Sequence, residues 1–220
     1  MVSDFPSLYQ IETRIRAALK SPLPGAAAHL KLAPRPRKGW HPDHVRPGAK
    51  NAAGLMLLYP VSDTPHFLLT VRAGALAQHG GQVSLPGGKV EPRETIQHAA
   101  LRETAEEVGV EPNRVRVLGS LSTLYIPVSD YALHPVVGVA DSRPVFRQRS
   151  AEVRRILEIS LERLLTPAGA PRRGAISRNG EEILVPYFEL QGERVWGATA
   201  MVLAELLALL GAIPVDPWDG

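Results

Sequence analysis

The sequence predicts an α/β fold in which helices pack on a mixed β-sheet. Segments with helical and strand-like patterns follow one another in the order helix, strands, helix, strands, helix, and this order favours a sheet covered by helices within one main domain. Apolar residues make up 45% of the 220 residues and charged residues 21%. These values are close to those of ordinary globular proteins, argue against intrinsic disorder, and provide enough apolar side chains for a sizeable core.

Residues 1–50 differ in composition from the rest of the chain. Apolar residues recur at helical spacing over 5–20, which predicts a short amphipathic helix. Residues 21–50 are rich in Pro, Gly, Arg and His, few of which continue a helix or an inner strand, so we expect a long irregular arm, with a homodimer contact as one possible use. The basic run Arg35–Lys38 in this arm either contacts phosphates or is a solvated charge run, and the second interpretation is favoured. The main domain is predicted at 51–212, followed by a C-terminal tail at 213–220.

Short apolar runs rich in strand-forming residues predict the sheet. Residues 53–61 and 67–72 flank a segment with turn chemistry and predict a hairpin. A brief strand is expected around 82–85 within the glycine-rich segment 79–91. Further strands are expected at 115–122, 132–140 and 183–190.

Two further helices are predicted. Residues 93–108 form the first, which ends at Gly109, a residue type that commonly closes a helix. Residues 197–211 form the second and most apolar helix, so most of its surface should be buried. Residues 152–165 fit either a strand at 154–159 followed by a short helix or one continuous helix.

Composition excludes several classes of protein. The chain has no cysteine, which rules out disulfide scaffolds, thiolate zinc sites and cysteine nucleophiles and fits a cytoplasmic location. The net charge of +3, from 25 Lys+Arg and 22 Asp+Glu, suits an anionic small molecule and does not require nucleic acid. No apolar stretch approaches the roughly 20 residues that span a bilayer, and the N-terminus lacks the pattern of a signal peptide. We therefore expect neither nucleic acid nor a membrane as partner.

The segment 87–110 gathers acidic residues directly after a glycine-rich loop. On a helix, Glu103, Glu106 and Glu107 stand at i, i+3 and i+4, so their side chains emerge on one face within about one turn. A solvated acidic face compensated by Arg102 is one interpretation. The clustering of carboxylates without alternating lysines, beside glycines that allow close approach of a ligand, favours a Mg²⁺ or Mn²⁺ site. The opposite face can pack on a sheet through Ile96, Ala99, Ala100 and Val108.

The same segment resembles the signature of the Nudix hydrolase family. Gly88 is followed after five residues by Glu94, and seven more residues lead to Arg102-Glu103, then to Glu106-Glu107 and Gly109. Every charged and glycine position of the signature agrees, while Thr104 stands at a usually aliphatic position, where it should affect packing more than chemistry. The resemblance implies an α/β/α sandwich around a mixed sheet and hydrolysis of a diphosphate linkage in a nucleoside diphosphate joined to another group.

The resemblance also implies which residues carry the reaction. Glu106 and Glu107 would be the principal ligands of Mg²⁺ or Mn²⁺, Glu103 would be a third ligand or the general base, and the Gly87 carbonyl would supply a further ligand. Arg102 and its upstream partner Glu94 would orient the carboxylates. The metal ions would screen the diphosphate charge and lower the pKa of the attacking water.

Residues 68–88 resemble the segment found just upstream of this signature in coenzyme A pyrophosphatases. The positions that agree are Leu68, Leu69, Thr70, Arg72, Gly81, Pro86, Gly87 and Gly88. Ala77 stands where the pattern has Arg, and Leu85 where it has Phe. An arginine at position 77 could clamp a phosphate and alanine cannot. The resemblance implies coenzyme A or its thioesters as substrate and 3′,5′-ADP and 4′-phosphopantetheine as products.

Four residues outside the acidic cluster are candidates for contact with a nucleotide-type substrate. Gly88 allows close approach, and Arg72 is either a phosphate ligand or a surface residue at a strand end. His79 is either a phosphate donor or a structural loop residue, and Glu152 is either a late carboxylate reaching the metal site or an exposed loop residue. Trp196 is interpreted as a packing residue at a helix start.

Two other functions remain open. The chain could hydrolyse another nucleoside diphosphate derivative, such as ADP-ribose, a dinucleotide or a nucleoside triphosphate. It could also be a Nudix scaffold that binds a nucleotide or RNA without turnover, although the intact acidic set argues against this alternative. Arg172 and Arg173, in a segment rich in Pro and Gly, are expected to be solvated.

Overall fold

The computed structural model describes residues 5–42, 44–74, 81–178, 180–212 and 218. Its helices are α1 (Leu8–Ala18), α2 (Gly25–Leu32), α3 (Ile96–Val108), α4 (Leu161–Leu165) and α5 (Gly197–Leu209), with short 3₁₀ turns at Pro112–Arg114 and Pro167–Gly169. The strands are β1 (Lys50–Val61), β2 (Thr64–Arg72), β3 (Val83–Ser84), β4 (Gly87–Lys89), β5 (Arg116–Ser120), β6 (Leu124–Ile126), β7 (Tyr131–Val139), β8 (Val153–Ser160), β9 (Arg172–Arg178), β10 (Glu181–Leu190) and β11 (Glu193–Trp196).

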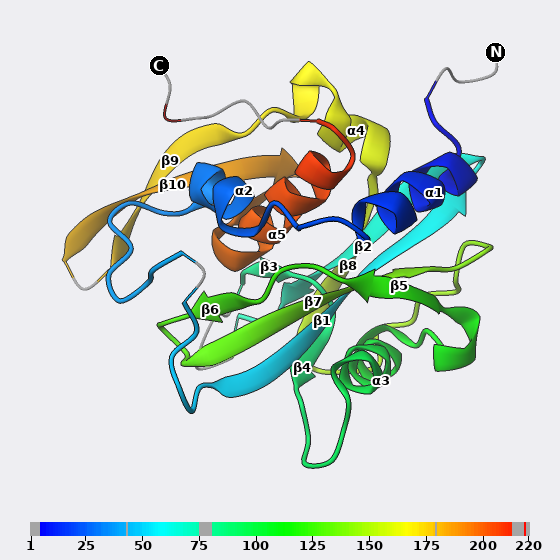
Figure 1. Ribbon diagram of the computed structural model, residues 1–220, viewed down its shortest axis with the longest axis horizontal. Helices are drawn as coiled ribbons and strands as arrows, with labels where there is room; N and C mark the ends of the chain where they lie inside the picture. The colour runs from blue at the N-terminus through cyan, green and yellow to red at the C-terminus, as the bar shows by residue number, and fades with distance from the viewer. Residues whose placement is uncertain (1–4, 43, 75–80, 179, 213–217, 219–220) are drawn as a thin grey trace.

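A mixed sheet forms the centre of the molecule (Figure 1). Within the described residues it has eight strands. The main path is β3-β2-β1-β7-β5, with β4 paired to β1, β6 to β7 and β8 to β2. Strands β1 and β7 run parallel, with Lys50 opposite Tyr131 and Leu58 opposite Val139, whereas β1 and β2 form an antiparallel hairpin. The turn of this hairpin places Ser62 and Asp63 at positive φ, as a tight two-residue hairpin turn requires. The predicted mixed sheet and hairpin are confirmed.

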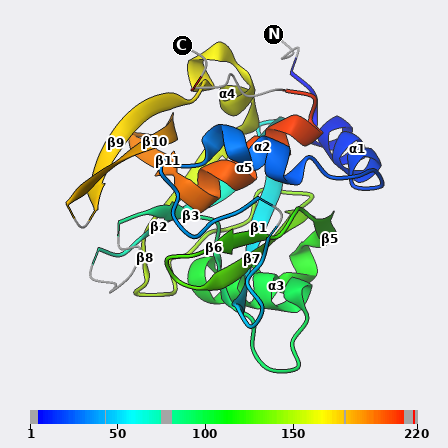
Figure 2. The ribbon, with the colours of Figure 1, turned by 60° about the vertical axis from the view of Figure 1, so that its left-hand side comes forward.

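Helices cover both faces of the sheet. Helix α3 lies on one face, and α1, α2 and α5 lie on the other together with the smaller sheet β9–β11 (Figures 1 and 2). The side chains of β1 point alternately to the two faces of the sheet. Leu55 and Leu57 belong to the hydrophobic cluster under α3, whereas Met56 and Leu58 belong to a larger cluster on the opposite face. The α/β/α sandwich implied by the family resemblance is therefore confirmed.

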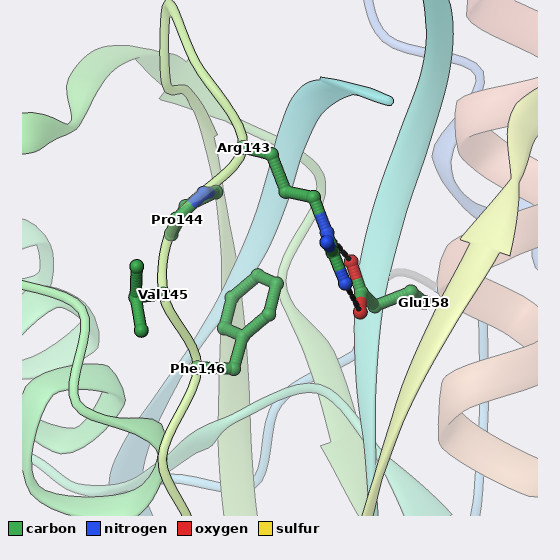
Figure 3. A pocket seen from close by; sticks show the side chains of 5 residues that line it. All are labelled: Arg143, Pro144, Val145, Phe146 and Glu158. Atoms are coloured by element: carbon green, nitrogen blue, oxygen red, sulfur yellow. Dashed lines mark hydrogen bonds and ion pairs between the residues drawn. The ribbon is translucent and has the colours of Figure 1, made fainter. Parts of the chain in front are cut away.

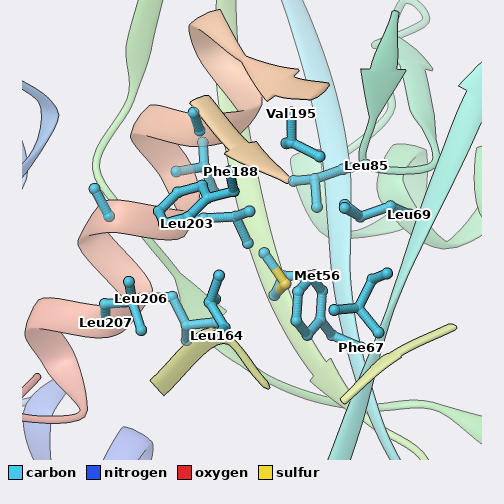
Figure 4. Close-up of a cluster of buried hydrophobic side chains, with 14 of the residues drawn as sticks. Met56, Phe67, Leu69, Leu85, Leu164, Phe188, Val195, Leu203, Leu206 and Leu207 are labelled. Atoms are coloured by element: carbon cyan, nitrogen blue, oxygen red, sulfur yellow. The ribbon is translucent and has the colours of Figure 1, made fainter. Parts of the chain in front are cut away.

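The larger core lies between the sheet and α5. Figure 4 shows Met56 and Phe67 from the sheet facing Leu203 of α5 and Phe188 of β10. All residues from Thr199 to Leu207 are buried, and all of them except Thr199 and Glu205 are apolar, as suits a helix that is covered on every side. Helix α3 instead buries one side, and Gly109 ends it in the left-handed conformation with φ 76°, as predicted. No helix among the described residues is long and apolar enough to cross a membrane.

Several elements correct the expectation from sequence. Helix α2 forms within the segment 21–50 that was predicted to be irregular, because Ala26–Ala28 favour a helix and its buried side rests on α5. Strands β4, β6, β9 and β11 were not expected, and pairing with longer neighbours stabilises all four. Arg172 and Arg173 accordingly begin β9 instead of lying in a loop, although both are exposed as expected. Residues 152–165 adopt the first alternative, strand β8 followed by α4.

Candidate active site

The candidate site residues gather where β1 begins and β4 pairs with it. Gly88 lies opposite Ala53 and Gly87 opposite Gly54. A Cβ atom on Gly87 would lie 2.2 Å from the Ala53 carbonyl oxygen, and one on Gly88 would lie 2.5 Å from Cδ of Glu103. Both positions therefore require glycine, the first for contact between strands and the second for contact with the carboxylate of α3.

Glu107 is the most deeply buried carboxylate of α3. Its residue exposure is 5%, and its Oε2 accepts a hydrogen bond of 3.3 Å from the main-chain N–H of Gly87. Burial raises the pKa of Glu107 to about 7, the Gly87 hydrogen bond and the charge of Arg72 oppose this rise, and Glu103 and Glu152 add to it. The site therefore holds a desolvated carboxylate whose ionised form needs additional positive charge.

Glu103 and Glu106 differ in their surroundings. Burial raises the pKa of Glu103, while its hydrogen bond with Arg102 and the attraction to that charge lower it. The side chain of Glu103 is 18% exposed, whereas that of Glu106 is 58% exposed. Glu103 is therefore held between α3 and the glycine strand, and Glu106 extends into solvent.

Arg102 connects the acidic residues to one another. Its Nε and Nη2 atoms donate to the two Glu94 oxygens at 2.9 and 3.0 Å, and Nη2 also donates to the Lys89 carbonyl at 3.1 Å. Its Nη1 donates to Glu103 at 2.8 Å and to Glu106 at 3.2 Å. The hydrogen bonds with Arg102 hold the pKa of Glu94 below its usual value. This arrangement fastens the segment after β4 to α3 and fixes the direction of the Glu103 carboxylate.

Arg72 and Glu152 lie next to this cluster. Arg72 ends β2, at a shift in its register with β8, and its Nη2 donates to Glu152 Oε2 at 3.1 Å. The buried Nε atom of Arg72 has no hydrogen-bond partner among the described residues. The charge of Arg72 lowers the pKa of Glu107 and the charge of Glu152 raises it, so both residues lie near Glu107. His79 and Ala77 lie outside the described residues.

The chemistry of these groups fits a hard divalent cation. Carboxylate oxygens and a main-chain carbonyl are the ligands that Mg²⁺ and Mn²⁺ prefer, and a cation would compensate the desolvated charges of Glu103 and Glu107. No three Asp, Glu, His or Cys side chains in the described part of the chain already converge closely enough to hold an ion. Glu106 is the exposed member of the set and is bonded to Arg102, so its side chain has room to rotate.

A polar group that the sequence did not predict lies beside the site. His134 stands opposite Ala53 in the parallel pair of β7 and β1. Its Nδ1 is 3.0 Å from Thr123 Oγ1 and its Nε2 is 2.9 Å from Asn51 Oδ1, and burial lowers its pKa. Strand alternation alone does not identify this residue, because its proximity to the glycines follows from the parallel pairing of distant segments.

Two other features lie away from the acidic cluster. Trp196 is partly buried opposite Tyr187 at the start of α5, in agreement with a packing role. A hollow of about 270 Å³ is lined by Arg143, Pro144, Val145, Phe146 and Glu158 (Figure 3). The Arg143 guanidinium makes two hydrogen bonds with Glu158, and Tyr59 near the far end of β1 contacts the same carboxylate. This hollow is therefore remote from the glycines at the start of β1.

The sandwich with an acidic helix following a glycine strand defines the class of protein. Residues 50–179 match the model of the NUDIX domain, and the chain belongs to the Nudix hydrolase family. It is accordingly an enzyme of the pyrophosphohydrolase type.

Individual relatives agree with this assignment. The chain is 33% identical over 155 residues to an uncharacterized Nudix hydrolase named NudL from Photorhabdus laumondii, with 70% of this chain and 82% of the relative covered. It is 30% identical over 190 residues to Nudix hydrolase 3 from Caenorhabditis elegans, with 77% and 78% covered. A crystal structure of the Nudix hydrolase RenU from M. smegmatis matches with a TM-score of 0.54 at 18% identity, covering 81% of this chain and 94% of RenU. The last comparison supports the fold alone.

Proposed function

We propose that this Nudix hydrolase cleaves the diphosphate linkage of coenzyme A or acyl-coenzyme A. The products are 3′,5′-ADP and 4′-phosphopantetheine or its acyl form. The observation that supports this choice is the segment 68–88, whose sequence resembles that of coenzyme A pyrophosphatases and which contains Arg72, whose charge acts on Glu107. An arginine whose buried Nε has no partner within the described ranges of the chain offers a donor to a phosphate oxygen.

In this proposal, each residue of the site takes part in metal binding, carboxylate positioning or substrate binding. Glu106, Glu107 and the Gly87 carbonyl would hold the Mg²⁺ or Mn²⁺ ion, and Glu103 would be a third ligand or the general base. When bound, this cofactor neutralises diphosphate charge, acts as a Lewis acid and lowers the pKa of the attacking water. Arg102 and Glu94 keep the Glu103 carboxylate aimed at the glycine strand. Arg72 and Glu152 form the substrate side, together with the main chain of Gly88.

A substrate screen with matched variants tests this proposal. Purified enzyme is incubated with Mg²⁺ or Mn²⁺ and coenzyme A, acetyl-coenzyme A, ADP-ribose, a dinucleoside polyphosphate or a nucleoside triphosphate, and products are separated chromatographically. We expect coenzyme A to have the highest kcat/KM and Glu106→Gln to abolish turnover, while Glu111→Gln, an exposed carboxylate after α3, keeps it. A higher kcat/KM for another substrate would reject the coenzyme A assignment, and full activity of the Glu106 variant would reject the proposed site.

Glu103 has two candidate roles, which a second variant separates. If Glu103 is the general base, Glu103→Gln keeps its affinity for Mn²⁺ and loses kcat. If Glu103 is a ligand, the variant loses Mn²⁺ affinity as well. Titration of Mn²⁺ binding alongside the kinetic assay distinguishes the two.

The second candidate function is hydrolysis of another nucleoside diphosphate derivative. The observation that favours it is Ala77, which replaces the arginine of the coenzyme A segment. If the lost arginine once held a phosphate, Ala77→Arg lowers the KM for coenzyme A. An unchanged or higher KM would show that loss of a phosphate contact does not explain why alanine replaces arginine at position 77.

A further inference from the structure

Arg37 is a partly buried cation without an anionic partner among the described residues. Its Nη1 contacts the Met201 sulfur, and its Nη2 lies 3.5 Å from the Tyr125 carbonyl oxygen. It forms no ion pair with the part of the chain that the structure describes, whereas Arg72 and Arg102 each face a carboxylate. Burial lowers the pKa of Arg37 to about 10. Burying a guanidinium without an anion beside it destabilises the folded state. The Arg37 side chain is therefore suited to bind an anionic group of a ligand.

The neighbours of Arg37 hold its guanidinium in place and add no negative charge in the contacts described. Its Cζ lies 4.8 Å from the ring centroid of Trp40, and Trp40 packs against the larger core. Met201 belongs to α5 and is fully buried. The adjacent Lys38 differs, because its side chain is exposed and paired with Glu181. Arg37 therefore departs from the solvated charge run predicted for Arg35–Lys38.

Arg37 lies at the same end of the sheet as the acidic cluster. Tyr125 of β6 pairs with Ala132 near the start of β7, and Ala132 lies opposite Asn51 near the start of β1. Strand β4 follows on the other side of β1. The step from β6 to β4 is three strand spacings, or about 14 Å. The phosphate groups on the 3′ and 5′ oxygens of one ribose lie closer together than this, so the Arg37 side chain and the bound cation must each cover part of the distance.

The remaining connection runs through α5. Thr199 of α5 donates from Oγ1 to the Val83 carbonyl at 2.9 Å, and Val83 belongs to β3, just before the glycine strand. In Figures 1 and 2 the segment between α2 and β1 runs past β6 on the α5 side of the sheet. A ligand that contacts both Arg37 and the α3 carboxylates thus extends across the end of the strands, from one face of the sheet to the other.

We infer that Arg37 and Trp40 form a second phosphate subsite, which binds a phosphomonoester of the substrate remote from the diphosphate that is cleaved. This inference rests on the proposed function, in which that group is the 3′-phosphate of coenzyme A. Arg37 binds the phosphate dianion through its guanidinium, and Trp40 fixes the orientation of the guanidinium. The arm before the NUDIX domain thereby contributes to substrate choice.

Coenzyme A and 3′-dephospho-coenzyme A differ only in the group that Arg37 binds, so the pair isolates this contact. We expect Arg37→Met to raise the KM for coenzyme A about tenfold or more and to leave the KM for the dephospho compound within twofold. Lys38→Met, which removes the same charge from the neighbouring residue, should change neither. Because Arg37→Met removes a desolvated charge and keeps an apolar side chain, its Tm should equal or exceed that of the wild type.

Two kinds of result would overturn the inference. One is an equal change in KM for both substrates, or no change for coenzyme A. The other comes from calorimetric titration with 3′,5′-ADP and with 5′-AMP, which needs no turnover: the wild type should prefer 3′,5′-ADP and Arg37→Met should lose that preference. If the wild type cleaves neither coenzyme A compound, the proposed function fails, and the titration alone decides the phosphate subsite.

Discussion

The three glutamates of α3 share one helix face and differ in burial. Glu107 is buried, Glu103 is partly covered by the glycine strand, and Glu106 is exposed. Arg102 donates to Glu103 and Glu106 and leaves Glu107 to the main chain of Gly87. The scaffold therefore fixes two of the carboxylates, and the third keeps the freedom to adjust to a ligand.

The two glycines of β4 give contrasting predictions. In Gly88→Ala the new Cβ meets the Glu103 side chain, so the carboxylate must move, and we expect kcat to fall on the order of 100-fold with a small change in Tm. In Gly87→Ala the Cβ meets the main chain of β1, so we expect the free energy of unfolding to fall by about 3 kcal/mol. Steady-state kinetics and urea unfolding of both variants check this. A loss of stability in Gly88→Ala together with a loss of kcat alone in Gly87→Ala would contradict the contacts assigned to the two glycines.

Thr104 departs from the family signature at a position inside α3. It is buried, and its hydroxyl donates to the Ala100 carbonyl of the preceding turn at 2.7 Å, so its polar group is satisfied within the helix. We expect Thr104→Val to change the free energy of unfolding by about 1 kcal/mol or less and to keep kcat. A large loss of activity on this substitution would show that the hydroxyl takes part in the site.

At the scale of elements, a buried polar group fastens α2 to α5. Glu205 of α5 is fully buried and lies 2.9 Å from His29 Nε2. It also accepts hydrogen bonds from the main-chain N–H groups of Ser122 and Gly25. One carboxylate thus joins the N-terminal segment, the loop before β6 and the central helix.

Loss of the Glu205 charge should destabilise the protein in a pH-dependent way. Burial by itself raises the pKa of Glu205, but hydrogen bonds from His29 and Ser122 outweigh it, so the pKa is lowered. A lowered pKa stabilises the fold above the unfolded value and loses this effect as pH falls through the folded value. We expect Glu205→Gln to lose about 1–3 kcal/mol at pH 7, and the difference from wild type to shrink in acid.

Urea unfolding at pH 7 and at successively lower pH measures this difference. Glu182→Gln, an exposed carboxylate of β10, serves as the control and should show no such trend. A Glu205 effect that is constant with pH would contradict the role of the ionised carboxylate.

Elements with their own hydrophobic period were predictable from sequence, and elements that depend on partners were not. Helix α3 and the hairpin of β1 and β2 follow from local patterns and turn residues. Helix α2 has only eight residues and depends on packing against α5. Strand β9 is exposed and is stabilised by its pairing with β10. Its sequence is rich in Arg and lacks the alternation of apolar and polar residues that predicts a strand.

In the candidate site, too, the residues of a local motif were predictable and those that depend on distant segments were not. The fixed spacing of the signature predicted Glu94, Arg102 and the three glutamates, and the structure brings these five residues together on α3 and the segment before it. The environment of Arg37 was not predictable, because it depends on Tyr125 and Met201, which lie far along the chain. His134 was missed for the same reason.

At the scale of the whole molecule, helices α1 and α2 share the core of the predicted domain at 51–212. Ile11, Ile15 and Leu32 are fully buried in the cluster that contains Met56 and Leu58. We therefore expect a chain that lacks residues 1–49 to expose this apolar face, to lose cooperative unfolding and to aggregate. Thermal unfolding and light scattering check this. A soluble, cooperatively folded fragment 50–220 would support a domain boundary at residue 50.

The central claim is that the acidic face of α3 binds a divalent cation. The most direct measurement is a crystal soaked in Mn²⁺, with anomalous scattering recorded at a wavelength where manganese contributes. We predict a manganese peak bounded by carboxylate oxygens of Glu103, Glu106 and Glu107, with Glu106 turned away from Arg102. A crystal that shows those carboxylates without a manganese peak between them would contradict the account.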